Sequence, residues 1–124
     1  MKSIHEKTAR EFAAEAVEAL GEHIYSIVLY GSVVRGEASD ESDIDVLVIG
    51  DGQSGAEDRV LDISYEIDLR NHTATSIFYS TPEDFERRLK LGSPFIEDVL
   101  SAGKVLHDNG TFKRLREQMP AIGG

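Results

Sequence analysis

The chain contains no cysteine, and it has only three prolines among its 124 residues. Without cysteine it can form no disulfide bond, no thiolate nucleophile and no zinc site built on sulfur ligands. No segment approaches the roughly 20 consecutive apolar residues that a membrane-spanning helix needs. Residues 1–20 mix charged and apolar side chains, which is not the pattern of a signal peptide. We therefore expect a cytoplasmic protein that does not enter a membrane.

Basic residues are scarce, with 13 lysines and arginines against 23 acidic residues and a net charge of -10. Such a surface repels a phosphate backbone, so general binding of DNA or RNA is not expected. A nucleotide that arrives as its Mg²⁺ complex remains compatible with it, and solubility alone is the simpler explanation of the charge. The composition is that of a folded chain, and the length predicts a single domain over residues 1–124.

Hydrophobic spacing and turn residues predict alternating helices and strands along the chain. We expect helices over residues 3–20, 33–37, 56–69, 81–91, 94–102 and 111–119, strands over 24–30, 43–49, 73–80 and 103–107, and a frayed end over 120–124. This order predicts an α/β (α+β) fold with a short mixed β-sheet and helices packed mainly on one face. The aromatic residues are interpreted as core or partly buried, without a stacking surface for nucleic acid: Tyr30, Tyr65, Phe78, Tyr79, Phe85 and Phe95.

A glycine and a serine follow the first predicted strand, which ends at Tyr30. The backbone N–H groups at the start of a helix have no partner within the helix, and they attract anions. Gly31 lets a phosphate approach the backbone closely, and Ser32 can add a hydroxyl contact. The same turn occurs in many ordinary loops, so alone it is weak evidence for a phosphate site.

Two aspartates, Asp43 and Asp45, stand at the start of the next predicted strand. Side chains alternate along a strand, so both carboxylates are expected on one face, with Ile44, Val46 and Val48 on the other. Adjacent carboxylates repel each other unless a cation binds them, and carboxylate oxygens suit Mg²⁺. A solvated strand start with two acidic residues is the alternative reading of this pair.

The two features together form a known pattern: Gly31-Ser32, ten residues, then Asp43-Ile44-Asp45. This resembles the motif of nucleotidyltransferases similar to DNA polymerase β, and residues 31–45 are similar to the minimal nucleotidyltransferase branch. The resemblance implies that Gly31 and Ser32 hold phosphates and that Asp43 and Asp45 are catalytic ligands of Mg²⁺. Arg35 either contacts phosphate or forms an ion pair, for which Asp40, Glu41 and Asp43 are the candidate partners.

The resemblance also implies an activity and a partner. The activity is Mg²⁺-dependent transfer of a nucleoside monophosphate from a nucleoside triphosphate, with ATP as the expected donor. Relatives often act as antitoxins of a helical HEPN-domain toxin, some by adenylylating a toxin tyrosine, so a HEPN partner is an expectation here too. The alternative is a module of the same fold that binds nucleotide or partner without catalysis.

One part of the family pattern is missing, namely a third carboxylate on a later strand. Residues 73–80 contain no Asp or Glu, and the best alignment puts Thr73 or Thr75 at that position. Asp68 lies upstream, and it could replace the acid only if the predicted helix ended before it. His72 is a further candidate ligand or base, although a histidine in a loop is more often a bystander.

Overall fold

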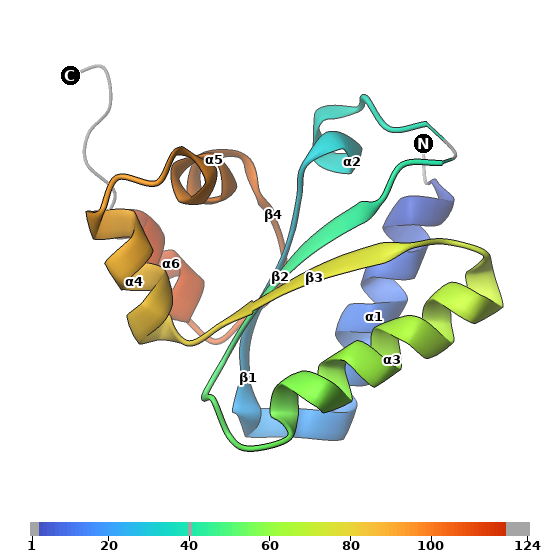
Figure 1. Ribbon diagram of the computed structural model, residues 1–124, viewed down its shortest axis with the longest axis horizontal. Helices are drawn as coiled ribbons and strands as arrows, with labels where there is room; N and C mark the ends of the chain where they lie inside the picture. The colour runs from blue at the N-terminus through green and yellow to red at the C-terminus, as the bar shows by residue number, and fades with distance from the viewer. Residues whose placement is uncertain (1–2, 40, 119–124) are drawn as a thin grey trace.

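The computed structural model describes residues 3–39 and 41–118, and a four-stranded sheet forms its centre (Figure 1). The strands lie in the order β3-β2-β1-β4. Their bounds are β1 Ile24–Tyr30, β2 Ile44–Gly50, β3 Thr75–Ser80 and β4 Lys104–Asp108. Strand β1 runs antiparallel to β2 and β4, whereas β2 and β3 are parallel. The sheet is therefore mixed, as the sequence predicts.

Six α-helices and one short 3₁₀ helix surround the sheet in the described part of the chain. The helices are α1 Ile4–Leu20, α2 Ser32–Arg35, α3 Ala56–Asn71, α4 Pro82–Lys90, α5 Pro94–Ala102 and α6 Thr111–Glu117, and the 3₁₀ turn is Gly21–His23. Helix α3 continues two residues beyond its expected end, and β2 begins one residue late, so Asp43 precedes it. The expectations for residues 119–124 lie outside the described residues.

Local sequence signals explain where three of these helices begin. The Ser3 hydroxyl accepts a hydrogen bond from the Glu6 backbone at 3.1 Å, and Thr81 does the same for Asp84 at 3.2 Å. Ser93 caps α5, and both α4 and α5 carry proline in the first turn. Such caps stabilise backbone N–H groups that have no partner inside the helix.

Helices cover both faces of the sheet, which differs from the expectation that they lie mainly on one. The two long helices α1 and α3 pack with Ile44, Val46 and Val48 in one core. The shorter α4, α5 and α6 pack with Leu47 and Ile49 in a second core (Figure 1). The alternation in the sequence misses this because β2 is apolar on both faces beyond Asp45, as strands between two helical layers are.

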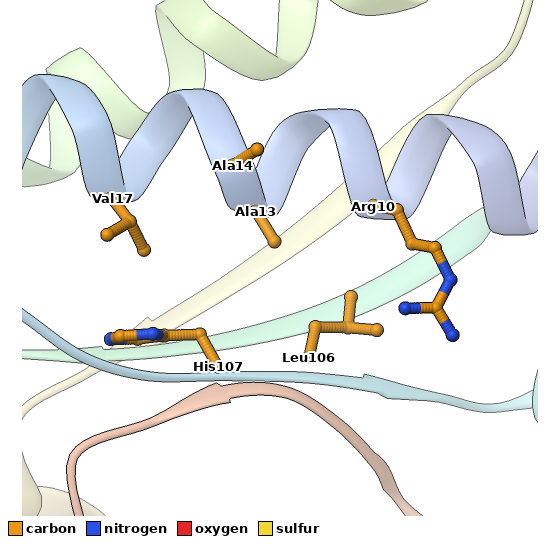
Figure 2. Close-up of a pocket in the computed structure, with 6 residues that line it drawn as sticks. All are labelled: Arg10, Ala13, Ala14, Val17, Leu106 and His107. Carbon is orange, nitrogen blue, oxygen red and sulfur yellow. The ribbon is translucent and has the colours of Figure 1, made fainter.

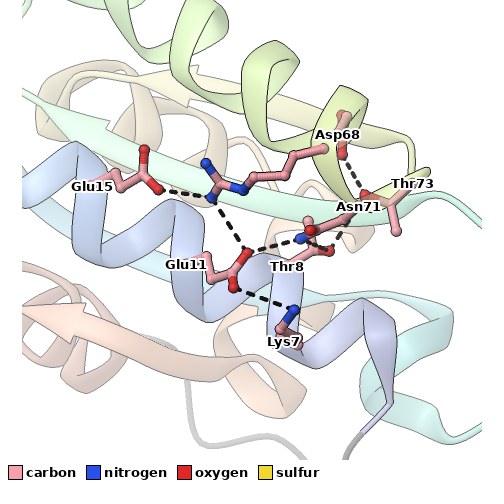
Figure 3. Close-up of polar contacts among 8 residues, drawn as sticks. Lys7, Thr8, Glu11, Glu15, Asp68, Asn71 and Thr73 are labelled. Carbon is pink, nitrogen blue, oxygen red and sulfur yellow. Dashed lines mark hydrogen bonds and ion pairs between the residues drawn. The ribbon is translucent and has the colours of Figure 1, made fainter.

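Polar side chains join α1 to the end of α3 (Figure 3). The Asn71 amide donates hydrogen bonds to Thr8 Oγ1 at 3.0 Å and to Glu11 Oε1 at 2.8 Å. Arg70 donates to Glu15 Oε2 at 3.0 Å. These bonds fix the point at which α3 ends, and thereby the point at which β3 can begin. Over residues 3–39 and 41–118 no helix is long and apolar enough to cross a membrane.

The carboxylate of Asp108 connects β4 to α6 and to β1. It accepts hydrogen bonds from the Ser26 hydroxyl at 2.7 Å and from the backbone of Gly110, Phe112 and Lys113 at 3.0 to 3.1 Å. Burial alone would raise the pKa of Asp108, but these hydrogen bonds outweigh it and lower the pKa. The ionised carboxylate therefore stabilises the fold.

Replacing Asp108 with Asn should lower the free energy of unfolding by about 2 kcal/mol at neutral pH, because hydrogen bonds to a charged acceptor are lost. A lowered pKa in the folded state contributes stability that is present above about pH 4 and is lost as the pH falls through the folded pKa. The difference in the free energy of unfolding between wild type and Asp108→Asn should therefore become smaller in acid. Urea unfolding across a pH series measures it, with Asp62→Asn on α3 as the control. Equal losses in both variants would refute the assignment.

Candidate functional site

Gly31 brings the two parts of the sequence motif into contact. It ends β1 with φ +80° and ψ -152°, a conformation that suits glycine. A Cβ atom placed on Gly31 would overlap Oδ2 of Asp45 and would lie 3.2 Å from its carboxyl carbon. The Asp45 carboxylate thus lies directly against the glycine backbone. Ser32 opens α2 at this point, so the first backbone N–H groups of that helix start beside the carboxylate.

The Asp45 carboxylate is half-buried and lies near a second carboxylate. Burial raises the pKa of Asp45, repulsion from Asp43 raises it further, and the charge of Arg35 lowers it. Asp43 is exposed and comes one residue before β2. In the part of the chain that the structure describes, neither carboxylate accepts a hydrogen bond or an ion pair. Two such neighbouring acids are suited to a divalent cation.

Arg35 forms an ion pair, but with a partner that the sequence did not indicate. Its Nε donates to Glu37 Oε1 at 2.9 Å, and this hydrogen bond is the main reason that the pKa of Arg35 is raised. The candidate partners Glu41 and Asp43 do not pair with it, and Asp40 lies outside the described residues. The guanidinium still acts electrostatically on Asp45 and on Asp98 of α5. Arg35 therefore lies at the edge of the Asp45 site.

The register of the sheet identifies the position next to Asp45 on the neighbouring strand. Asp45 pairs with Ser76 of β3, and Ile44 pairs with Thr75. Residues in register across a parallel pair share a face, so Ser76 lies on the Asp45 face, whereas Thr75 lies on the face of α1 and α3. The alignment of Thr73 or Thr75 with the missing acid is therefore wrong. The position beside Asp45 holds an exposed serine.

Asp68 has a structural role and does not supply the missing carboxylate. Its side chain accepts a hydrogen bond from the Thr73 hydroxyl at 2.8 Å (Figure 3). It also accepts hydrogen bonds at 2.8 Å from the Thr75 backbone and the Thr75 hydroxyl. Helix α3 continues past it to Asn71. The condition under which Asp68 could replace the acid, an earlier helix end, is not met. Its carboxylate instead connects the end of α3 to the start of β3 through these hydrogen bonds.

Two aromatic residues are more exposed than the sequence interpretation expects. Tyr65 is 65% exposed on the outer face of α3, and Phe95 is 43% exposed in the first turn of α5. Tyr30, which pairs with Asp45 across the sheet, is half-buried, and burial together with the Asp45 charge raises its pKa to about 12. Sequence reasoning missed Ser76 and Phe95 as neighbours of the site because only the strand register and the placement of α5 bring them there.

A separate hollow on the surface contains none of the motif residues. It lies between α1 and the edge strand β4, has a volume of about 270 Å³, and is lined mainly by Ala13, Val17, Leu106, Arg10 and His107 (Figure 2). It has no carboxylate that could hold a metal ion. Among residues 3–39 and 41–118, no group of three or more His, Asp or Glu side chains is placed to hold a metal. The Gly31–Asp45 region carries the sequence motif and is therefore the candidate site.

Comparison with known protein families supports the motif. Residues 10–107 match the family model described as a nucleotidyltransferase domain. The chain belongs to this nucleotidyltransferase family. Two curated relatives from Methanocaldococcus jannaschii, MJ0604 and MJ1305, are provisionally named protein adenylyltransferases. MJ0604 is 31% identical over 82% of this chain and 97% of its own length. MJ1305 is 30% identical over 82% of this chain and 71% of its own length.

Solved structures confirm the nucleotidyltransferase fold. A toxin–antitoxin crystallised with AMP-PNP superimposes with a TM-score of 0.60 at 15% identity, over 88% of this chain and 82% of that one. The toxin–antitoxin MntA–HepT gives a TM-score of 0.54 at 14% identity, over 89% of this chain and 79% of that one. At this level of identity the match establishes the fold and no residue roles.

Proposed function

We propose that this protein transfers a nucleoside monophosphate from Mg-ATP to an acceptor, with pyrophosphate as the leaving group. The observation that carries the proposal is the contact between Gly31 and the Asp45 carboxylate. That contact supports a site in which the Gly-Ser turn would bind phosphate beside the two aspartates, in a chain of the nucleotidyltransferase family. The fold match alone would not support an activity, because one fold can host several functions.

Asp43 and Asp45 are the residues that would hold the divalent cation, for which we propose Mg²⁺. The fit rests on their chemistry, since burial and repulsion from Asp43 outweigh the attraction of Arg35 and disfavour the ionised form of Asp45. Mg²⁺ is usually bound by one or two carboxylates together with substrate phosphates. When bound, it would neutralise phosphate charge as the pyrophosphate leaves.

The remaining motif residues would position the triphosphate. The backbone at Gly31 and Ser32 would bind the β- and γ-phosphates through N–H groups at the start of α2. Arg35 would exchange its Glu37 partner for phosphate, since its guanidinium is about half exposed and acts electrostatically on Asp45. Positioning and charge neutralisation supply most of the catalysis in phosphoryl transfer.

The acceptor in this proposal is a hydroxyl of a partner protein, with a HEPN-domain toxin as the specific candidate. Two observations support a protein acceptor. The curated relatives are named as protein adenylyltransferases, and the solved structures of the same fold are toxin–antitoxin pairs. This chain would then act as the antitoxin by modifying its toxin.

Calorimetric titration of Mg-ATP into the wild-type protein tests the binding step. We expect one site whose binding is lost when EDTA removes the metal. ATP labelled in the α-phosphate, added together with a HEPN-domain protein encoded beside this chain, tests the transfer step. Label on the partner would support the proposal, whereas metal-independent binding or label released only as free nucleotide would contradict it.

A specific observation also favours a second function, a nucleotide-binding module that does not catalyse transfer. The position beside Asp45 on β3 is Ser76, and the oxygens of Asp68 are occupied by Thr73 and Thr75. A site with two carboxylates would bind Mg-ATP but would lack a third acid to assist the attacking hydroxyl. Binding without transfer to any acceptor would favour this function.

Replacing Ser76 with Asp should place a third carboxylate in register with Asp45. Without metal the added repulsion should lower the unfolding temperature, and Mg²⁺ should raise it by about 4 °C more than in wild type, because three carboxylates bind the cation more tightly. Thermal unfolding with and without Mg²⁺ measures both effects, with Ser76→Asn as the uncharged control. Identical Mg²⁺ responses in the two variants would show that Ser76 does not face the metal position.

A further inference from the structure

A half-exposed phenylalanine lies close to the acidic pair. The Phe95 ring packs against Tyr30 with a centroid distance of 5.4 Å and an interplanar angle of 75°. It also packs against Phe78 at 5.5 Å and 64°. Tyr30 pairs directly with Asp45, and Phe78 follows Ser76 by two residues on the same face. The Phe95 ring therefore contacts Tyr30, and Tyr30 is the direct neighbour of Asp45 on the adjacent strand.

The two edge-to-face contacts fix the orientation of Phe95 while leaving 43% of it exposed. Edge-to-face pairs of this kind are favourable beyond the area that they bury. Single exposed apolar residues are common on protein surfaces, but Phe95 differs in that two aromatic contacts hold its ring in one orientation. The exposed ring is therefore available for a planar ligand.

The charges around Phe95 also suit a nucleotide. Arg88 of α4 lies over the Phe78 ring at 5.4 Å from its centroid, and it forms no ion pair within the described residues. Asp98, one turn after Phe95 on α5, interacts electrostatically with Arg35 of α2. Helices α2 and α5 lie at the same end of the sheet in Figure 1. Helix α5, which carries Phe95, thus lies near the turn at Gly31 and Ser32.

We propose that the exposed surface of Phe95, held in place by Tyr30 and Phe78, is the stacking surface for the nucleobase of the bound triphosphate. This inference rests on the proposed function, because it assumes that the phosphates lie at Gly31 and the aspartates. Tyr30 pairs with Asp45 across the sheet and its ring contacts that of Phe95, so a nucleotide with its α-phosphate near Asp45 would extend its base toward Phe95.

Stacking on one phenylalanine is tolerant of base identity, because every base has a π-face. The ring contacts of Phe95 are aromatic, and stacking itself does not distinguish one base from another. ATP and GTP should therefore bind with affinities within a few fold of each other. A strong preference for one base would need a contact that Phe95 does not supply.

The test compares Mg-ATP with Mg-tripolyphosphate, which carries the phosphates without a base. Phe95→Leu should weaken Mg-ATP binding about tenfold in calorimetry, a typical effect of losing one stacked base. It should leave Mg-tripolyphosphate binding unchanged. Leu91→Ala is the matched control, because Leu91 is 79% exposed in the turn before α5 and should affect neither ligand.

Phe95→Trp supplies a second readout and a conservative rescue. The chain has no tryptophan, so this variant carries a single indole fluorophore. Its fluorescence should change on addition of Mg-ATP and not on addition of Mg-tripolyphosphate, and its affinity for Mg-ATP should equal that of wild type or exceed it. Equal weakening of both ligands by Phe95→Leu, or an unresponsive indole in a protein that binds Mg-ATP, would overturn the inference and leave the proposed function standing. Failure of wild type to bind either ligand would overturn both.

Discussion

Replacing Gly31 with Ala is expected to abolish Mg-ATP binding and to lower the free energy of unfolding by about 3 kcal/mol. Two causes act together. The backbone at Gly31 has φ +80°, where a side chain is strained, and the new Cβ would overlap the Asp45 carboxylate. Relief of that overlap must move either β1 or Asp45, and either movement separates the phosphate-binding turn from the acidic pair. Urea unfolding and calorimetric titration measure the two losses.

Gly36→Ala separates the two causes. Gly36 ends α2 with φ +74°, but a Cβ atom there meets nothing within 4 Å. This variant should lose about 1 kcal/mol from backbone strain alone and should still bind Mg-ATP. If both glycine variants lose the same stability and keep their binding, the contact between Gly31 and Asp45 is not the basis of the site.

Replacing Asp45 with Asn should have opposite effects on activity and on stability. If Asp45 holds the cation as proposed, its removal should lower nucleotidyl transfer about 100-fold or more, since charge neutralisation by the cation contributes several kcal/mol to catalysis. In the absence of metal the same variant should be slightly more stable than wild type. The reason is that burial and the charge of Asp43 both disfavour an ionised Asp45 in the folded protein.

Thermal unfolding without Mg²⁺ and transfer assays with Mg²⁺ measure the two effects of Asp45→Asn on one preparation. Asp62→Asn, an exposed residue of α3, should change neither quantity. A variant that loses stability together with activity would indicate a structural role for Asp45. In that case the acidic pair would no longer be the metal site.

The motif was predictable from sequence because its parts depend on local chemistry. A strand that ends at Tyr30 and a glycine at positive φ follow from β-branched residues and from the Gly-Ser turn. The caps at Ser3 and Thr81 are local too, so the helix starts agree closely with expectation. The absence of a third carboxylate on the third strand was also predictable, since residues 73–80 contain no Asp or Glu.

Other features depend on long-range packing that periodicity does not encode. The partner of Asp45 on β3 is Ser76 because Asp68 fixes Thr73 and Thr75 at the end of α3, and this sets the register. The second helical layer was missed because α4, α5 and α6 are short and their apolar faces gave no indication of which side of the sheet they cover. Phe95 lies near Tyr30 only because α5 packs on that face of the sheet.

The two cores on opposite faces of the sheet also predict how fast backbone amides exchange with solvent. Strands β1 and β2 are covered on both sides and paired on both edges, so their central amides should exchange only through global unfolding. Helix α2 has only four residues, and its Val33 and Val34 are only partly buried against the first core, so its amides should exchange through local opening. The turn at Gly31 and Ser32 therefore lies at the border between slowly and rapidly exchanging parts of the chain. A bound triphosphate should slow exchange there without altering the strands beside it.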